Sequence, residues 1–221
     1  MIPWLSPALE QLFVDAALET LTMVGGAAAV AILLGLPLAL LLYATGPGGL
    51  AQNGLANRPL GLLVNAVRST PFIILMVAIV PFTRLVAGTS IGTTAAIVPL
   101  ALAATAFIAR LFETAFREVD RGVIEAARAR GATRLQILVK VVVPEAMPGL
   151  IAAITVTLVS LVGYSAMAGA VGGGGLGDLG IRFGYQRFMP EVMASVVVVL
   201  IVFVQGLQSL GDWIVRRIRR R

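Results

Sequence analysis

Four long stretches of this 221-residue sequence carry no charge, and this feature limits the folds open to the chain. No Asp, Glu, Lys or Arg occurs in residues 20–57, 85–109, 146–177 or 192–211. An α-helix needs roughly 20 consecutive apolar residues to cross a membrane, and each stretch can hold one. The chain is 58% hydrophobic and 13% charged, whereas a soluble domain needs more polar surface. We therefore expect an all-α integral membrane protein.

We predict five transmembrane helices, of which the second has the least regular sequence because Arg68 interrupts it. Turn-forming residues separate the spans, beginning with Gly-Pro-Gly-Gly at 46–49. A short polar link is expected at 83–90, and a glycine-rich link before the last span. We expect one transmembrane domain over residues 1–221, with spans at residues 16–43, 59–82, 91–111, 149–170 and 192–213.

The placement of Lys and Arg predicts the orientation of these spans, since cytoplasmic loops of membrane proteins carry the excess of basic residues. If the long connection at 112–148 and the C-terminus are cytoplasmic, only Arg84, Arg182 and Arg187 of the 17 basic residues lie outside. This orientation places the N-terminus outside and requires an odd number of spans, which five satisfies. The start of the chain lacks the basic region of a cleavable signal peptide, so we expect the first span to remain.

Several chemistries are disfavoured by the composition. The sequence has no Cys and no His, which removes disulfides, thiolate chemistry, the commonest general base and the commonest transition-metal ligand. We expect no catalytic residue and no metal site. Basic residues lie at the ends of spans without interleaved aromatics, so the expected surroundings are a lipid bilayer and not nucleic acid.

Gly172, Gly174 and Gly177 match the pattern G-x-G-x-x-G, but they follow a membrane span and not a strand. We interpret them as close-packing residues or as a flexible outer link. The sequence also lacks a Walker A motif with its lysine, so any ATP hydrolysis would need a separate protein.

The long hydrophilic connection predicts two short helices joined by a corner. Asp120 is a plausible N-cap for the first, and Gly131 suits the left-handed position that ends it. Thr133 and Gln136 have capping-box spacing for the second, which we expect Pro144 to stop. On composition alone, this region could equally be an amphipathic hairpin lying on the membrane surface.

The spacing of residues within this connection favours a more specific interpretation. It reads Glu-Ala-Ala at 125–127, then Gly131, then Val-x-Val-Pro at 141–144. This resembles the EAA motif of bacterial ABC importer permeases, with valines at the two late apolar positions. The resemblance implies the type I ABC importer permease fold and a cytoplasmic coupling-helix hairpin at residues 120–144, which we call the coupling segment. The ATPase-coupling residues that it implies are Glu125, Ala126, Ala127, Arg128, Gly131, Ala132, Thr133 and Pro144.

Other stretches extend the resemblance over nearly the whole chain. Residues 68–75 resemble the second-span signature of amino-acid permeases, and residues 81–84, 88–92 and 163–177 resemble methionine importer permeases. The resemblance implies a homodimer in the bacterial inner membrane that translocates methionine by alternating access. The implied partners are two ATPase subunits, which bind ATP and Mg, and an extracytoplasmic substrate-binding protein, so this chain needs no cofactor of its own.

Two other classes of function remain as alternatives. One is an ABC permease for another amino acid or small solute. The other is an ion channel or membrane enzyme, which is disfavoured because the acidic residues lie at span ends and no filter loop is visible.

Four residues are candidates for the translocation pathway or its gate: Met167, Tyr164, Ser165 and Arg68. Arg68 lies near a proline that can break its span, where it could meet a substrate carboxylate; alternatively it reaches lipid phosphate. Met167 could form a hydrophobic constriction on the two-fold axis of a dimer, or simply fill space in the protein interior.

Overall fold

Helices form all the regular secondary structure in the part of the chain that the structure describes, residues 7–219 of a computed structural model. Four of these helices are long and apolar enough to cross a membrane. They are α1 (Pro7–Thr45), α5 (Thr93–Arg117), α9 (Met147–Ala168) and α11 (Pro190–Arg219). Helices α1 and α11 extend beyond the predicted spans at both ends, whereas α5 begins two residues after the predicted start at 91 and α9 ends two residues before the predicted end at 170.

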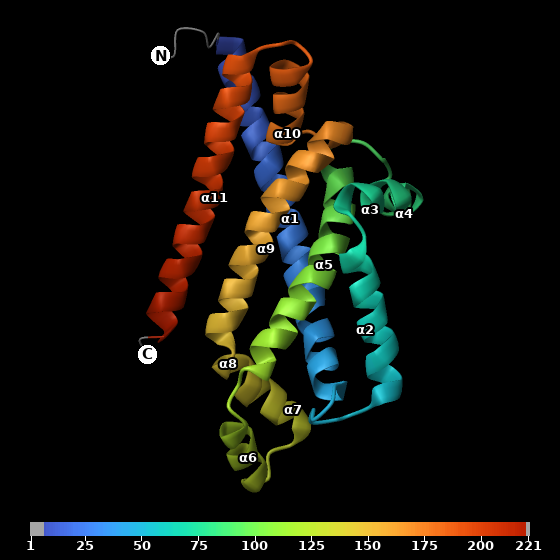
Figure 1. Ribbon diagram of the computed structural model, residues 1–221, viewed down its shortest axis with the longest axis vertical. Helices are drawn as coiled ribbons and strands as arrows, with labels where there is room; N and C mark the ends of the chain where they lie inside the picture. Colours follow the sequence, from blue (N-terminus) through green and yellow to red (C-terminus); the bar gives the residue numbers. More distant parts are fainter. Residues whose placement is uncertain (1–6, 220–221) are drawn as a thin grey trace.

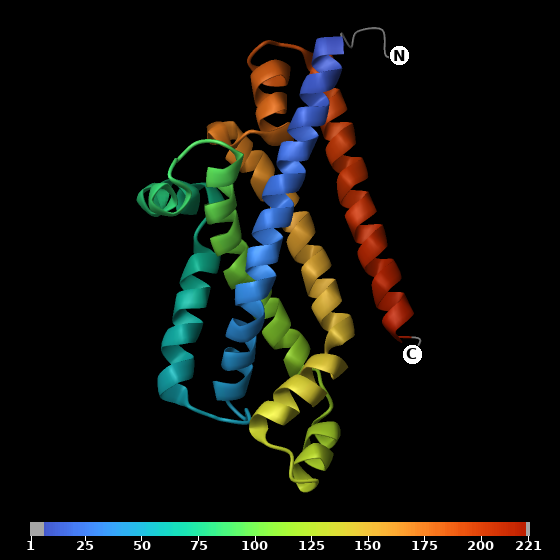
Figure 2. The same ribbon diagram turned by 180° about the vertical axis from the view of Figure 1, so that it is seen from behind.

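The central helix of the bundle is α5, which packs along α1 and also contacts α9 and α2 (Figures 1 and 2). Small residues dominate the buried surfaces of α1 and α5, as in Ala27, Ala31, Ala101 and Ala104. Small side chains let helix backbones approach closely, which is the main source of attraction between helices within lipid. In contrast, α11 lies on the outer side of α9 and exposes many large apolar side chains along its length (Figure 1).

The predicted second span is not one straight helix. Residues 59–82 lie in α2 (Gly54–Ser69), α3 (Phe72–Ala78) and the beginning of the next helix, and α2 and α3 are bent by 107° relative to each other. Thr70, the residue before Pro71, has an extended backbone with φ −84° and ψ 125°, as expected because proline disfavours helix in its predecessor. The bend therefore places α3 and the following α4 (Val80–Ala87) beside one end of α5 (Figure 1).

The polar link predicted at 83–90 is also shorter than expected. Helix α4 continues to Ala87 and ends at Gly88, whose φ of 75° is the left-handed conformation that glycine adopts easily.

The coupling segment lies at one end of the bundle, beyond the ends of α1 and α2 (Figures 1 and 2). It contains α6 (Arg121–Ala129), α7 (Arg134–Ile137), the π-helical η1 (Leu138–Val142) and α8 (Val143–Glu145). The prediction that Pro144 stops the second helix is wrong, since helix continues through it to Glu145. The wider π turn immediately before Pro144 accommodates the missing N–H and the bulk of the ring, which a regular α-helix cannot do without a kink.

The glycine-rich connection forms short helices that fold back against α1. These are η2 (Gly169–Gly173), α10 (Gly175–Leu179) and η3 (Gly180–Tyr185). The amide of Gly175 donates to Glu19 Oε2 at 2.6 Å, and the amide of Leu176 donates to Thr20 Oγ1 at 2.9 Å. Of the three glycines in the G-x-G-x-x-G match, Gly174 and Gly177 support the close-packing interpretation, since an added Cβ would meet Glu19 Oε2 at 2.6 Å and the Cα of Ala166 at 2.5 Å.

Candidate functional site

The coupling segment is held in shape by hydrogen bonds within its own sequence. Asp120 Oδ1 accepts from the amide of Gly122 at 2.7 Å and caps α6. Gly131 has a φ of 81°, which ends the first helix in the left-handed conformation. Thr133 Oγ1 accepts from the amide of Gln136 at 3.3 Å, and Gln136 Oε1 accepts from the amide of Thr133 at 2.9 Å. The predicted cap, corner and capping box are therefore confirmed.

The Glu-Ala-Ala sequence divides between the interior and the surface of the protein. Ala127 is only 4% exposed and belongs to the main core together with Ile137 and Val142. The amide of Ala132 donates to the carbonyl of Ala127 at 3.2 Å and closes the corner. Glu125 and Ala126 are exposed, as are Arg128, Gly131 and Thr133. One alanine therefore anchors the corner, while the other residues remain available to a partner.

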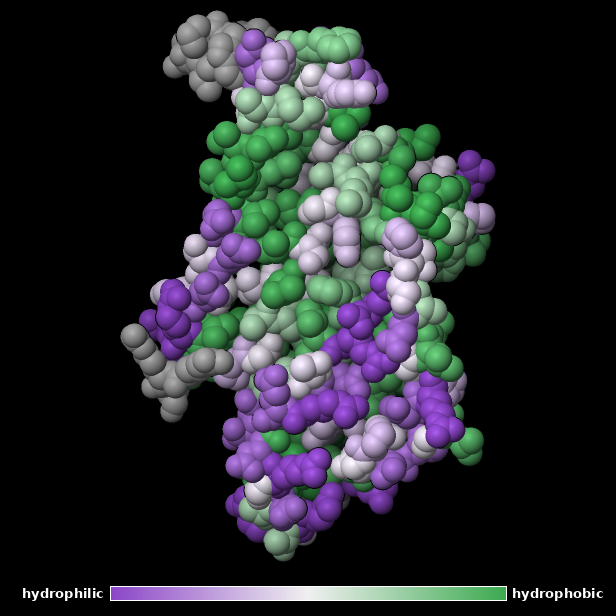
Figure 3. Space-filling model, in the orientation of Figure 1, coloured by the Kyte–Doolittle hydropathy of each residue, from purple (hydrophilic) through white to green (hydrophobic). Residues whose placement is uncertain are grey.

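The outer side of the coupling segment also exposes large apolar side chains. Val123 is 38% exposed, Leu135 is 70% exposed and Val139 is 52% exposed. These residues lie among cationic ones, and this end of the molecule is largely hydrophilic in Figure 3. Apolar side chains exposed among charges are typical of a surface that a partner protein covers.

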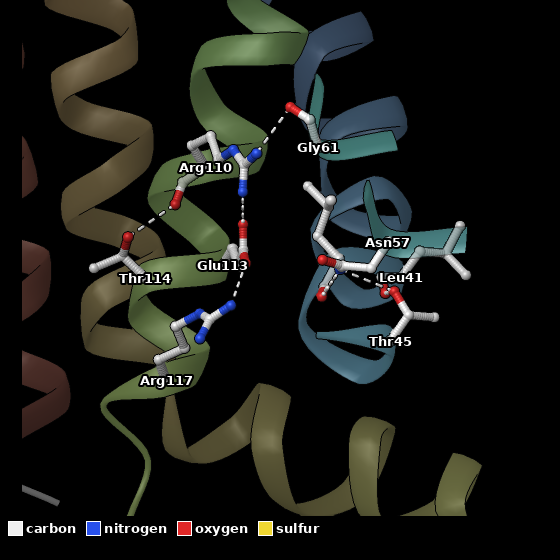
Figure 4. Close-up of polar contacts among 9 residues, drawn as sticks. Leu41, Thr45, Asn57, Gly61, Arg110, Glu113, Thr114 and Arg117 are labelled. Atoms are coloured by element: carbon white, nitrogen blue, oxygen red, sulfur yellow. Dashed lines mark hydrogen bonds and ion pairs between the residues drawn. The ribbon is translucent and has the colours of Figure 1, made fainter. Parts of the chain in front are cut away.

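A charge network around the buried Glu113 joins α5 to α2 in the last three turns before the coupling segment (Figure 4). Glu113 is 4% exposed and pairs with both Arg110 and Arg117, each at 2.7 Å. Arg110 NH2 also donates to the carbonyl of Gly61 on α2 at 3.0 Å. We did not predict this network from the sequence. The spacing of Arg110, Glu113 and Arg117 at i, i+3 and i+7 was the available signal, since it places all three on one helix face.

A polar contact lies nearby between α1 and the start of α2. Asn57 Nδ2 donates to the carbonyl of Leu42 at 2.9 Å and to Thr45 Oγ1 at 3.1 Å (Figure 4). Together with the Arg110 network, this contact fixes α2 at the end of the bundle nearest the coupling segment.

The bend between α2 and α3 forms one wall of a cavity of about 150 Å³. The guanidinium of Arg68 lies 6.0 Å from the ring centroid of Phe107 on α5, and the ring of Phe72 stacks on that of Tyr164 at 4.9 Å. Arg68, Phe107, Phe72 and Tyr164 all line the cavity. The structure therefore brings together two of the four predicted pathway residues, from α2 and α9.

The other two candidates lie elsewhere on α9. Ser165 is 1% exposed, and its hydroxyl donates to the carbonyl of Val162 at 2.8 Å, so it is engaged within its own helix. Met167 is 48% exposed and faces away from the interior of the single chain. In the described part of the chain, no three Asp or Glu side chains gather closely enough to hold a metal ion.

These features define a class of protein, a multi-pass α-helical membrane protein with a structured polar hairpin at one end. A family model of the binding-protein-dependent transport system inner membrane component matches residues 31–221. The chain belongs to this family, the permease subunits of ABC importers, and it has their type I fold. It is accordingly an inner-membrane transport subunit and not an enzyme.

Two relatives within this family are similar over most of the chain. A probable D-methionine transport system permease protein MetI of Vibrio cholerae is 54% identical over 210 residues, covering 95% of this chain and 93% of the relative. The D-methionine transport system permease protein MetI of Escherichia coli K12 is 50% identical over 165 residues, covering 75% and 76%.

Solved structures agree with these relatives. An inward-facing structure of the MetNI methionine ABC transporter is 48% identical, with a TM-score of 0.95, and covers 97% of this chain and 99% of its own. An amino acid ABC transporter structure with histidines shares the fold, with a TM-score of 0.79 at 21% identity over 95% of each chain.

Proposed function

We propose that this chain is the permease subunit that translocates methionine across the inner membrane in an ATP-driven importer. The observation that carries the proposal is the 54% identity to a probable D-methionine permease over 95% of the chain. The TM-score of 0.95 to a chain of the MetNI methionine ABC transporter supports it, because the two chains have nearly the same backbone fold.

The proposed arrangement has five spans in a single transmembrane domain over residues 1–221. The bent pair of α2 and α3 provides the second span, in addition to the four long helices. The N-terminus is outside and the C-terminus and coupling segment are cytoplasmic, as the distribution of basic residues favours.

The coupling segment is proposed to dock with an ATPase subunit that binds ATP and Mg. Its capped, rigid shape and its exposed Val123 and Leu135 support this role, since a rigid element can transmit a movement that a flexible loop would absorb. Glu125, Ala126, Ala127, Arg128, Gly131, Ala132, Thr133 and Pro144 make up the proposed docking sequence.

The proposed assembly contains two copies of the permease, two ATPase subunits and an extracytoplasmic substrate-binding protein. The likeness to MetNI, a methionine ABC transporter, supports an ATPase partner and a paired permease. The large apolar side chains that α11 exposes are available for contacts with other subunits. ATP binding would close the ATPase pair, draw the coupling segments together and shift the permease toward its outward-open state.

The cavity at the bend of α2 and α3 is the proposed point where the pathway meets the substrate. Arg68 supplies a guanidinium for the carboxylate of an amino acid, and the stacked rings of Phe72 and Tyr164 supply an apolar wall. Met167 is proposed as a gate residue that contacts a second copy of the chain. Ser165, which is buried and hydrogen-bonded within α9, is proposed to stabilise the helix that carries this gate.

The alternative cargo is another amino acid or small solute, because a guanidinium recognises a carboxylate and not a particular side chain. The test is uptake of labelled methionine by vesicles that contain the permease, its ATPase and its binding protein, with other amino acids as competitors. Uptake that requires ATP and is competed only by methionine supports the proposal. Equal competition by unrelated amino acids would replace methionine with a broader cargo, and uptake without ATP would contradict the importer.

A further inference from the structure

A second cavity, of about 230 Å³, lies between the end of α1 and one face of α6. It is separate from the Arg68 cavity, with which it shares no described lining residue. Arg117, Arg121 and Arg128 line it, so three cationic residues border one small space.

Most of this positive charge is not neutralised within the chain. Among residues 7–219, Arg121 and Arg128 form no ion pair, while Arg117 shares Glu113 with Arg110. A guanidinium has five N–H donors, so Arg117 retains donors after pairing with Glu113. Glu125 is the one acid among the described lining residues, which leaves an excess of cations in the cavity.

The opposite wall is the backbone of the loop that follows α1. Gly48 and Gly49 line the cavity, and Gly48 has a φ of 73°. A side chain at Gly49 would collide with the carbonyls of Tyr43 and Ala44, so the loop can pass this close to α1 only without one. Tyr43 also lines the cavity and lies within electrostatic reach of Arg117 and Arg121. The cavity therefore combines cations with an aromatic hydroxyl and bare backbone.

The cavity lies where the apolar surface of the bundle ends. Leu41, shortly before it on α1, is 55% exposed, and Leu50 from the following loop lines the cavity itself. Figure 3 shows the same change on one face of the molecule, from a hydrophobic band to a hydrophilic end. In a bilayer this is the depth of the phospholipid headgroups, with acyl chains alongside the exposed leucine.

We propose that this cavity binds a phosphate group, and that an anionic phospholipid of the inner leaflet supplies it. Arginine pairs with phosphate through parallel hydrogen bonds, and several arginines around one anion strengthen the pairing. The headgroup would hold α6 against the loop after α1, so the position of the coupling segment would depend on the lipid. Free phosphate offers the same chemistry, and an acidic segment of a partner protein is the competing occupant.

The test uses the full-length chain in nanodiscs of phosphatidylcholine, with or without phosphatidylglycerol. Retained lipid is measured by native mass spectrometry, and thermal unfolding is measured with and without added inorganic phosphate. The variant is Arg121→Gln with Arg128→Gln. The control is Arg130→Gln with Arg134→Gln, which removes the same charge from the same segment at residues that do not line the cavity.

We expect the unmodified chain and the control to retain phosphatidylglycerol. The cavity variant should retain about tenfold less, because losing one hydrogen bond to a charged group lowers affinity by about this factor or more. Stabilisation by inorganic phosphate that is lost in the cavity variant, together with no retention of phosphatidylglycerol by the unmodified chain, would overturn the lipid as the source of the phosphate and assign the site to a free anion. Equal lipid retention and equal phosphate response in both variants overturns the proposal. Loss of lipid from the unmodified chain once the ATPase is bound also overturns it, in favour of a protein carboxylate.

Discussion

Arg110 on α5 donates a hydrogen bond of 3.0 Å to the carbonyl oxygen of Gly61 on α2, although the two residues are 49 positions apart. The same guanidinium pairs with Glu113, which is almost fully buried. A side chain at Gly61 would come within 3.1 Å of Arg110 NH2, so the glycine leaves room for this contact. The hydrogen bond therefore connects the helix that carries Arg68 with the helix that leads into the coupling segment.

Replacing Arg110 with Met tests this connection. The variant retains an apolar stem but leaves Glu113 with one partner and the Gly61 carbonyl without its side-chain donor. We expect the free energy of unfolding to fall by about 3 kcal/mol, since the two hydrogen bonds of Arg110 are lost and each hydrogen bond to a charged group contributes about 1.5–3 kcal/mol. The measurement is the midpoint of thermal unfolding in detergent. Arg117→Met is the control, and it should lower the midpoint less because the Arg117 side chain is 49% exposed. Equal shifts in the two variants would contradict the special role of Arg110.

The sequence predicted local features of the protein better than contacts between distant segments. Asp120, Gly131 and the Thr133–Gln136 pair were predictable because each capping interaction involves residues within four positions of one another. The network of Arg110 with Gly61 was not, because a backbone carbonyl of a distant helix leaves no trace in the sequence. The same reason explains why Glu19 was not recognised as the acceptor for the amide of Gly175.

Two prolines show why element boundaries were harder to predict. Pro71 breaks its predicted span sharply, and Pro144, which was expected to stop a helix, lies within one. Both lack an N–H, but the π turn at residues 138–142 absorbs Pro144, whereas an extended Thr70 precedes Pro71. The local sequence does not decide between these outcomes, since the surrounding helices determine which one packs.

The corner of the coupling segment predicts a graded response to substitution of Gly131. Its φ of 81° is unfavourable for most residues by about 1–2 kcal/mol, while asparagine tolerates this conformation better. A Cβ at Gly131 would meet nothing within 4 Å, so the effect comes from the backbone and not from crowding. We expect Gly131→Val to reduce ATP-dependent uptake and copurification of the ATPase, and Gly131→Asn to retain most of both. Similar losses in the two variants would show that side-chain bulk at a docking surface decides the outcome.

Arg68 provides a test of the substrate cavity. If its guanidinium binds the substrate carboxylate, Arg68→Ala should lower uptake about tenfold or more, with assembly unchanged. Arg58→Ala is the matched control, since Arg58 lies on the same helix but does not line the cavity. The measurements are initial uptake rates at several methionine concentrations and copurification with the ATPase. Normal rates in Arg68→Ala would instead favour an arginine that reaches lipid phosphate.

Met167 provides the test of the proposed gate, and its exposure of 48% in the single chain is what makes that test sensitive. A residue exposed on α9 faces either lipid or a second copy of the chain, and only the second position can close a pathway. Met167→Gly should therefore raise passive leak of methionine from vesicles without ATP, whereas Met167→Leu should keep the pathway closed. Val156→Gly is the control because Val156 is 49% exposed on the same helix, and glycine lowers helix stability by about 1 kcal/mol at either position. Equal leak from the two glycine variants would mean that α9 is merely weakened, and no leak from Met167→Gly would assign Met167 to the lipid-facing surface.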